Sequence, residues 1–593
     1  METARERRLD RLAAAYAVAA WLLVQAASIA LPAFDAPAWA LRWLIVAAVL
    51  GFALALAAGW ILNKGRVGAP SSLKGSEAIF LAAIALVGVL TLGELAWHWS
   101  AIVPSGPSED ASAPAGSVAV LPFDNMSGDP QQRYFSEGIS DELIGLLGRN
   151  PALRVAARTS SFFFEGKEQD IRGIAQKLNV RSILEGSVRQ QGGRVRIEAA
   201  LINAENGYQL WSQSYDRSLS DILAVQAEIA QAIAQALAPT LTGTASKPHA
   251  PKPVQIDPDV YRDYLQAQFY FDQRLSESQT PATRNALAQA VALLRSVAAR
   301  APDFADGEAA LAHALLWTQN DTELNGQIQQ AVNHALGIDP GNPQALLVKI
   351  EYAEGIWDWN GVIDNAVLLK RSAAHTAVGA QGLGRAYFDF NLLGQSLASY
   401  QEGARRDPFS ASVWDGIANN LFAQGRYQDA IAASDKALQL HPGDPVTLEY
   451  KCVSLANLNR IGEARDVLSQ LLQPGTPPFM GVHCKFFVTL HSDGSKAAIA
   501  YVDDVLAHDR KTIGYIGDAG FMLSHAGAFD QAMDWYEKAF NRQAWVFGFY
   551  PGVTTPPAFF QNPRWLALTR RPEYQRWLAA RARAIRVLAD GKS

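Results

Sequence analysis

The sequence predicts a multidomain protein with N-terminal transmembrane helices, an α/β module built on a mixed sheet, and a C-terminal all-α solenoid. Three observations predict this fold class. Three long charge-poor stretches occur in the first hundred residues, short strand and helix patterns begin at Ser117, and a 34-residue period runs through the second half. At 593 residues the chain is too long for one hydrophobic core, so several folding units are expected.

Residues 1–100 are predicted to form three transmembrane helices. The stretches 12–31 and 43–62 carry no charged residue, and 78–97 carries only Glu94 near its end. Each stretch is 20 residues long, which is enough for a helix to cross the apolar core of a bilayer. Glu94 is either a functional acid within the membrane or a side chain that reaches the interface, and its place near the helix end favours the interface.

Basic residues predict the orientation of these helices. Lys and Arg concentrate before the first stretch and between the second and third, whereas Glu109 and Asp110 follow the third. Because Lys and Arg stay preferentially on the cytoplasmic side, the residues after 100 are expected outside, in the periplasm of a Gram-negative cell. The predicted localisation is therefore the inner (cytoplasmic) membrane, as a multi-pass protein. If the first stretch is instead a cleaved signal peptide, two crossings give the same final side.

An α/β module is predicted at 117–240, after a linker at 101–116 that is rich in small residues and proline. Gly192 and Gly193 separate two runs of alternating apolar and polar residues, as a tight hairpin requires. The order β-α-β-α-β-β-β-α predicts one mixed sheet flanked by helices. Strands are expected at 117–123, 153–158, 181–190, 194–202 and 208–215, and helices at 134–147, 170–179 and 220–237.

Several sequence motifs of this module occur in the same order as in a known family of bacterial domains. The segments SVAVLPFDNMSGDPQQRYFSEGISDELI, ARTSSFFF and ILEGSVRQQGGRVRIEAALINAENGYQLWSQSYDR resemble the TolB amino-terminal-like domain of bacterial proteins, over about 117–237. In that family the module and its repeats follow nucleotide cyclase or DNA-binding domains, or stand alone behind membrane spans. This chain has neither output domain, so the resemblance implies neither of those activities.

The module offers weak candidates for catalysis. Ser160 and Ser161 precede three phenylalanines, but no histidine lies between 117 and 237 to activate a serine, so backbone capping and an aromatic core anchor are favoured. Three arginines on the predicted hairpin, Arg189, Arg194 and Arg196, either bind an anion or, as we favour, lie on an exposed strand face. An enzyme would have to build its site from Asp124, Asn125, Glu137 or the hairpin arginines Arg189, Arg194 and Arg196.

The segment 411–444 is the clearest copy of the 34-residue unit. Small residues fall where two antiparallel helices come closest, and a proline ends the second helix. This pattern resembles the tetratricopeptide repeat (TPR). Counting from Ala411, the matching residues are Trp414 at position 4, Gly425 at 15, Tyr427 at 17, Ala430 at 20, Ala437 at 27 and Pro442 at 32.

A ladder of such units extends in both directions. After a proline-rich linker at 241–258, about eight TPR repeats are expected over 259–546, and the unit that starts at Pro343 is the weakest match. Residues 547–593 are predicted to form capping helices. A single unit cannot bury its apolar face, so the units must stack, and the stack presents a binding surface.

Metal, cofactor and nucleotide motifs are not found in the sequence. It lacks G-x-x-x-x-G-K-[ST], H-E-x-x-H, G-x-S-x-G, C-x-x-C and G-x-G-x-x-G, so no cofactor or metal is predicted. Cys452 and Cys484 form a disulfide, a metal pair with His483 nearby, or two separate thiols; separate thiols are favoured. A net charge of −5 gives no reason to expect a nucleic-acid partner.

The favoured function is a non-catalytic, membrane-anchored scaffold that binds a protein or peptide in the TPR groove. A ligand-sensing signal-transduction subunit and an enzyme with a site in the α/β module remain alternatives. In TPR proteins, positions 5, 9, 12 and 13 of each unit face the groove, which implies a contact set centred on Phe422 beside Asn419 and Arg385. The alternative, which is favoured, is that these are solvated helix positions with an incidental phenylalanine. The full set is Arg385, Phe388, Asp389, Asp415, Asn419, Phe422, Glu449 and Asn457.

Overall fold

The computed structural model describes most of the chain from residue 113 onward. Ala111–Ser593 form one compact unit. The predicted transmembrane stretches and nearly all of both predicted linkers lie outside the described residues. Those residues are 113–167, 170–240, 256–275, 281–318, 322–473, 481–508, 516–542 and 555–589.

The prediction of a multi-pass membrane protein is corrected. Within the described ranges, no helix combines the length and apolar character needed to cross a bilayer. The two longest described helices, α8 (Pro258–Leu275) and α9 (Pro281–Arg300), both carry charges, as at Arg295 and Arg300 of α9. This finding contradicts the membrane part of the predicted fold class and the predicted inner-membrane localisation, and neither is retained.

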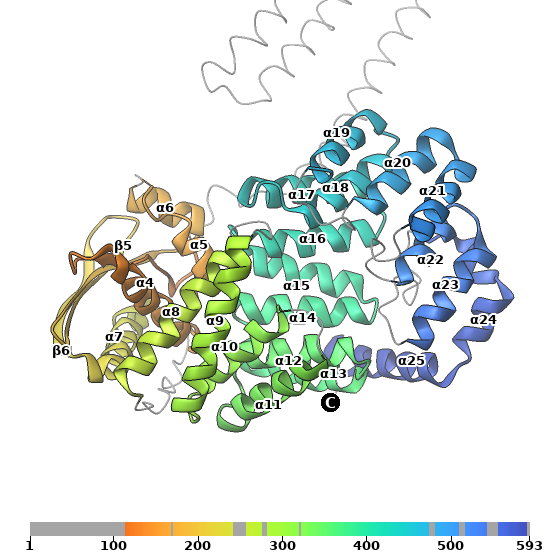
Figure 1. The fold of residues 1–593 in the computed structure, drawn as a ribbon. Helices are drawn as coiled ribbons and strands as arrows, with labels where there is room; N and C mark the ends of the chain where they lie inside the picture. Colours follow the sequence, from red (N-terminus) through yellow and green to blue (C-terminus); the bar gives the residue numbers. More distant parts are fainter. Residues whose placement is uncertain are drawn as a thin grey trace, which may run out of the picture. The chain divides into compact units, whose positions relative to one another are not determined.

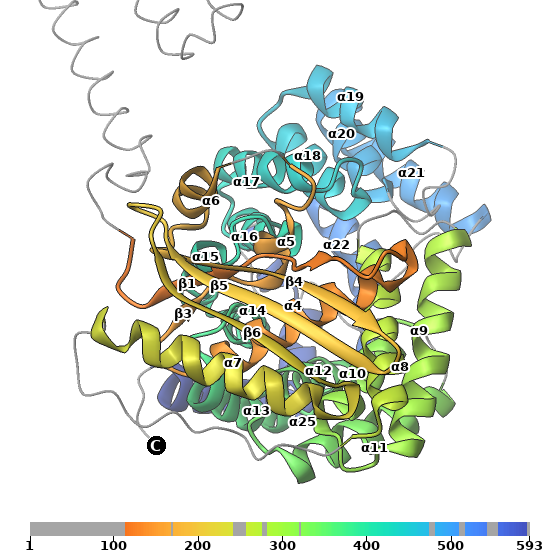
Figure 2. The ribbon, with the colours of Figure 1, turned by 90° about the vertical axis from the view of Figure 1, so that its left-hand side faces the viewer.

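The α/β module contains a six-stranded mixed sheet with the order β3-β1-β4-β5-β6, and β2 pairs with β4 (Figure 2). Parallel pairs join β1 to β3 and β4, and antiparallel pairs join β4, β5 and β6. The strands are β1 (Ser117–Val120), β2 (Asp124–Asn125), β3 (Arg154–Val155), β4 (Ser182–Gln191), β5 (Arg194–Asn203) and β6 (Gln209–Ser218). The helices are α4 (Arg133–Gly148), α5 (Arg158–Phe162), α6 (Ile171–Leu178) and α7 (Ile222–Leu237).

The element order within this module agrees with the predicted order, and two short elements, β2 and α5, are additional. The β4–β5 hairpin turns at Gly192 and Gly193, whose φ angles of 57° and 78° suit glycine. Helices α4 and α7 share one core with the sheet, and α6 packs in a second core that contains Ile174 and Ile183. Asp170 caps α6 by accepting a hydrogen bond from the backbone N–H of Gly173 at 2.7 Å.

Eight helix pairs follow in the described part of the chain (Figure 1). Asn342, Thr376, Ser410 and Asp444 cap the first helices of successive units, each through an oxygen that accepts a backbone N–H. The pairs are α8 and α9, α10 (Ala305–Leu316) and α11 (Thr322–Ile338), α12 (Pro343–Gly355) and α13 (Trp359–Ala373), α14 (Ala377–Asp389) and α15 (Leu393–Arg406), α16 (Ala411–Ala423) and α17 (Tyr427–Leu440), α18 (Pro445–Asn457) and α19 (Ile461–Leu471), α20 (Val482–Asp493) and α21 (Ser495–His508), and α22 (Ile516–His525) and α23 (Phe529–Asn541).

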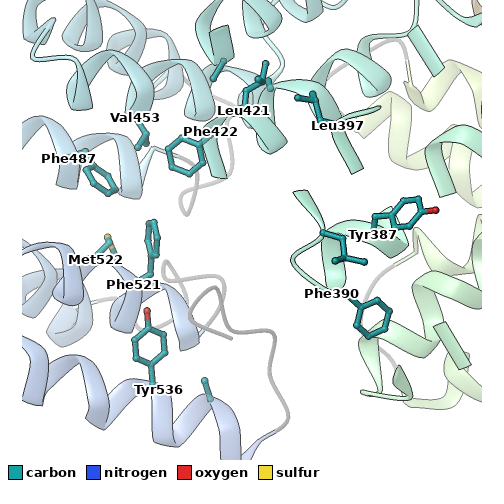
Figure 3. Packing of buried hydrophobic residues seen from close by; sticks show 14 of the residues in the cluster. Tyr387, Phe390, Leu397, Leu421, Phe422, Val453, Phe487, Phe521, Met522 and Tyr536 are labelled. Carbon is teal, nitrogen blue, oxygen red and sulfur yellow. The ribbon is translucent and has the colours of Figure 1, made fainter. Parts of the chain in front are cut away.

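The units stack through large side chains that fill the space beside small ones. Tyr400 of α15 lies between Gly384 and Gly416, and a Cβ atom at Gly416 would come within 2.2 Å of the Tyr400 ring. A continuous core runs from α12 to the C-terminal helices; Figure 3 shows buried residues from several first helices, such as Phe422, Phe487 and Phe521. Stacking thus buries the apolar face that a single unit leaves exposed.

The C-terminal segment forms η5 (Pro557–Gln561), α24 (Pro563–Thr569), α25 (Pro572–Ala584) and η6 (Ile585–Ala589). Trp565 of α24 packs on Tyr536 of the last pair, with ring centroids 6.0 Å apart. Helix α25 instead returns to the middle of the array, where Trp577 Nε1 donates to the carbonyl of Asp389 at 3.1 Å (Figure 1). The segment predicted as a cap therefore also closes the array onto α13 and α14.

The α/β module packs along loops that join successive units. Ser160 Oγ donates to Asp407 Oδ1 at 2.6 Å and accepts the backbone N–H of Phe409 at 2.9 Å. Phe163 stacks on Phe409 with centroids 4.2 Å apart, and His375 Nε2 lies 2.7 Å from the carbonyl oxygen of Gly148. The serine and phenylalanine motif thus caps the backbone of a distant loop and anchors the array, rather than capping local backbone.

Candidate functional site

The first helices of the units lie side by side and carry all eight residues of the predicted contact set. Arg385, Phe388 and Asp389 are on α14; Asp415, Asn419 and Phe422 are on α16; Glu449 and Asn457 are on α18. Ion pairs and hydrogen bonds join α12 to α14, and join α16, α18, α20 and α22 in series. We call this surface the inner face of the array.

Arg385 joins α14 to α12 on this inner face. Its Nε donates to Glu354 at 2.7 Å, and its Nη1 lies 3.4 Å from Glu351. Asp389 belongs to the same group, because burial first and then the charges of Glu354 and Glu351 raise its pKa well above the ordinary value, against the opposing effect of Arg385. These four residues form what we call the Asp389 cluster.

Asp415 and Asn419 continue the inner face on α16. The hydroxyl of Thr447 on α18 donates to Asp415, and burial raises the pKa of Asp415 to about 7. Asn419 Oδ1 is buried and has no hydrogen-bond partner among the described residues. A buried acceptor without a partner can accept a hydrogen bond from a donor on a bound molecule.

Phe422 belongs to the core rather than to the exposed part of the inner face. It is 6% exposed, and its ring lies 5.9 Å from that of Tyr427 and 6.1 Å from that of Tyr450. A substitution at Phe422 would therefore change stability as well as any binding. Asn457 donates to the carbonyl of Val453 in its own helix at 2.8 Å, and Phe388 is half-buried.

Glu449 leads to a charged chain that crosses three first helices. His483 Nδ1 of α20 lies 3.4 Å from Glu449 of α18, and its Nε2 lies 3.8 Å from Asp518 of α22. Burial lowers the pKa of His483, but the two carboxylates outweigh burial and raise that pKa to about 9. The imidazole is therefore protonated at neutral pH.

Sequence reasoning missed Glu351, Glu354, His483 and Asp518. Glu351 and Glu354 occupy positions 9 and 12 of the unit that starts at Pro343, so the positional rule could have found them. That unit matches the repeat pattern least well, and the predicted contact set is drawn from better-matching units. His483 occupies position 5 of its own unit, but it had been weighed only as a neighbour of Cys484.

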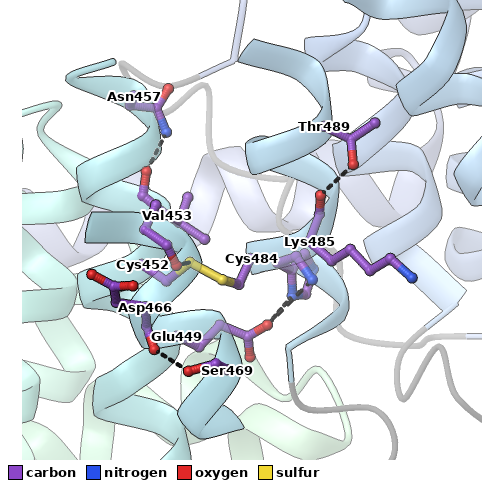
Figure 4. Close-up of a disulfide and its surroundings, with 11 residues drawn as sticks. Glu449, Cys452, Val453, Asn457, Asp466, Ser469, Cys484, Lys485 and Thr489 are labelled. Atoms are coloured by element: carbon purple, nitrogen blue, oxygen red, sulfur yellow. Dashed lines mark hydrogen bonds and ion pairs between the residues drawn. A yellow bond between two sulfur atoms is a disulfide. The ribbon is translucent and has the colours of Figure 1, made fainter. Parts of the chain in front are cut away.

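A disulfide joins Cys452 of α18 to Cys484 of α20, with a Cα–Cα distance of 5.5 Å (Figure 4). The favoured prediction of two separate thiols is wrong. The two positions are 32 residues apart, which is close to one repeat, so adjacent first helices bring them together. Within the described residues, no group of three metal-ligating side chains could hold a metal ion.

The residues proposed for an enzyme site differ in exposure and in their partners. Glu137 is buried on α4 and pairs with Arg133, whereas Asp124 is exposed on β2. Arg194 pairs with Asp216 at 2.5 Å on the hairpin, and Arg196 pairs with Glu198 at 3.0 Å. These pairs occupy an exposed strand face, as favoured from the sequence.

Two curated proteins share a part of this chain. "Putative adenylate cyclase 3" of Rhizobium meliloti (strain 1021) is 46% identical over 145 residues, which is 24% of this chain and 24% of that protein. "Superkiller protein 3" of Saccharomyces cerevisiae is 29% identical over 91 residues, which is 15% of this chain and 6% of that protein. The chain thus matches about a quarter or less of the length of either relative.

Solved structures and one family model bear on the array. Pseudomonas aeruginosa pilF is 16% identical with a TM-score of 0.27, over 36% of this chain and 92% of that chain. YrrB, described as "a TPR protein with an unusual peptide-binding site", is 13% identical with a TM-score of 0.25, over 32% and 97%. Likeness at this level says nothing of what this chain binds. Residues 421–476 match the family model described as tetratricopeptide repeat, so this chain carries tetratricopeptide repeats.

Proposed function

We propose that this protein is a non-catalytic scaffold that binds a protein or peptide on the inner face of its TPR array. The observation that carries the proposal is the buried, unpartnered Asn419 Oδ1 beside charged side chains that join successive first helices. Polar groups held in fixed positions by neighbouring helices can orient a peptide backbone with little loss of side-chain freedom. TPR proteins in general bind peptides or proteins, which supports the same function.

The α/β module has a positioning role in this proposal. The proposal includes a relation of this module to the TolB amino-terminal-like domain. The order of the strands and helices of the module supports that relation. Ser160 and Phe163 hold the loop between α15 and α16, so the module fixes the angle between units next to the inner face. The module thus keeps the units that carry the binding surface in a fixed arrangement.

A site-specific photocrosslinker tests the binding surface in cells of the source organism. Placed at Asn419, it should crosslink to one partner; placed at Gln439, an exposed position of α17, it should not. Both variants must melt like the unmodified protein. Equal crosslinking from both positions, or none from either, would remove the inner face as the binding surface.

The absence of catalysis is tested separately, because one relative is a putative adenylate cyclase. Purified protein is expected to show no nucleotide cyclase or hydrolase activity above buffer. Turnover that disappears on Asp124→Asn or Glu137→Gln would establish an enzyme instead, since such a loss ties the activity to the α/β module.

A further inference from the structure

The Asp389 cluster contains three carboxylates and one cation. Glu351 and Glu354 pair with Arg385, and Asp389 faces the same group. Asp389 is 1% exposed, and among the described residues its Oδ2 has no hydrogen-bond partner. A buried carboxylate oxygen without a partner is costly, so the cluster can accept one more hydrogen-bond donor.

Neighbouring side chains do not supply that donor. Trp577 Nε1 already donates its hydrogen bond to the backbone carbonyl of Asp389, and Arg581 Nε donates to the carbonyl of Phe390 at 2.9 Å. These contacts hold the end of α14 in place, and Asp389 lies close enough to Glu354 and Arg385 for their charges to act on its carboxyl. The part of the cluster nearest to solvent is the Arg385 side chain, which is 42% exposed.

The rest of the inner face carries the same sign of charge. Asp415, Glu449 and Asp518 are carboxylates on the next first helices, and His483 is the cation that lies among them. Charge complementarity therefore selects a basic partner over an acidic one. A metal ion is not the missing group, because no suitable set of three ligands exists within the described ranges.

We propose that the Asp389 cluster receives a lysine or arginine side chain from the bound protein segment, so that the segment recognised by this array is basic. This proposal rests on the proposed function, because it assigns a partner chemistry to the same inner face. The ammonium or guanidinium group donates to Asp389 Oδ2 and neutralises the excess of carboxylates.

Proton release gives this proposal a distinctive signature. Burial and the nearby glutamates raise the pKa of Asp389 well above its ordinary value, so this carboxyl holds a proton more readily than a free aspartate does. A bound cation favours the ionised form and lowers that pKa again. Calorimetric titration in two buffers of different ionisation enthalpy should therefore show release of protons on binding.

The experiment uses the full chain and labelled octalysine, octaarginine and octaglutamate peptides. Octalysine should bind, octaglutamate should not, and Asp389→Asn should weaken octalysine binding at least about tenfold and abolish proton release. Asparagine has the shape of a protonated aspartic acid, so the fold should be kept. Asp466→Asn removes one carboxylate from the exposed face of α19 and is the matched control, with less than a twofold effect. Glu351→Gln is a second variant in the cluster with the same expected weakening.

Equal octalysine affinity in the Asp389→Asn and Asp466→Asn variants, or no binding to the unmodified chain, would overturn the proposal. The outcome is separable from that of the proposed function. If the photocrosslinker at Asn419 captures a partner while Asp389→Asn changes nothing, the inner face still binds and only the basic chemistry fails. If the photocrosslinker at Asn419 captures no partner and Asp389→Asn does not change octalysine binding, both proposals fail.

Discussion

The Ser160 hydroxyl of the α/β module donates a hydrogen bond to the Asp407 carboxylate of the repeat array, across 247 residues of sequence. Both side chains are buried, and burial raises the pKa of Asp407 to about 6 although the bond from Ser160 lowers it. The same hydroxyl accepts the N–H of Phe409. One small side chain thus contacts two buried groups of the array, the Asp407 carboxylate, which Thr159 and Ser410 also bond, and the Phe409 N–H.

Replacement of Ser160 by alanine should lower the free energy of unfolding by about 1–3 kcal/mol, because it removes one hydrogen bond from the buried Asp407 carboxylate and leaves the Phe409 N–H without its acceptor. Urea unfolding followed by circular dichroism measures this loss. Ser212→Ala, on an exposed position of β6, is the control and should stay within about 0.5 kcal/mol. Equal stability of the two variants would mean that the module is held to the array by other contacts.

Stability should fall as the pH rises from 6.5 to 9, because in that window the unfolded chain has lost the His483 proton while the folded protein still holds it. Its folded pKa of about 9 lies above its ordinary value, so its stabilisation is complete below the ordinary value and is lost as the pH rises through 9. The loss should reach at most about 3 kcal/mol. His483→Gln should flatten this part of the profile, whereas Glu463→Gln, on α19, should keep it. Parallel profiles for all three proteins would contradict the charged chain.

Reduction of the Cys452–Cys484 disulfide should lower stability by about 2–4 kcal/mol, since the open chain gains freedom in the unfolded state. Thermal melting with and without a phosphine reductant measures the effect, and a Cys452→Ser, Cys484→Ser double variant should show none. Both cysteines are buried, so native protein should resist reduction more than unfolded protein. Two reactive thiols in unfolded, unreduced protein would show that the pair is not bonded.

Trp577→Ala should lower the free energy of unfolding by about 3–5 kcal/mol, because the indole is 2% exposed in the core that joins α25 to α14. Arg576 is the adjacent residue, and its side chain is 67% exposed. Arg576→Ala should therefore change stability by less than about 0.5 kcal/mol. Similar losses in both variants would argue against docking of α25 on the array.

Gly416→Ala should destabilise the array by about 1–3 kcal/mol, because the added methyl group meets the Tyr400 ring. Gly394→Ala, where a Cβ atom meets no neighbour within 4 Å, is the matched control. Denaturant unfolding would detect the difference. A neutral Gly416→Ala variant would show that Tyr400 moves aside freely.

Local pattern predicted the helix pairs and the order of the α/β elements, because amphipathic spacing, turn glycines and the repeat period are properties of neighbouring residues. It could not predict that Trp577 meets Asp389 or that Ser160 meets Asp407, since these partners are 188 and 247 residues apart in sequence. Cys452 and Cys484 lie about one repeat apart on adjacent first helices, so the repeat spacing could have indicated their pairing. Phe422 is a second example of what local pattern cannot predict. Its position in the unit suggested a contact surface, and packing on Tyr427 and Tyr450 places it in the core.

The return of α25 to the middle of the array changes how this chain must fold. In an open array each unit contacts only its neighbours, so end units can detach one at a time. Here Trp577 contacts a residue 188 positions earlier, and the last helices cannot leave without uncovering the core of α13 and α14. Unfolding should therefore be cooperative across the repeats, and folding should be slow, because closure must wait for distant segments to meet.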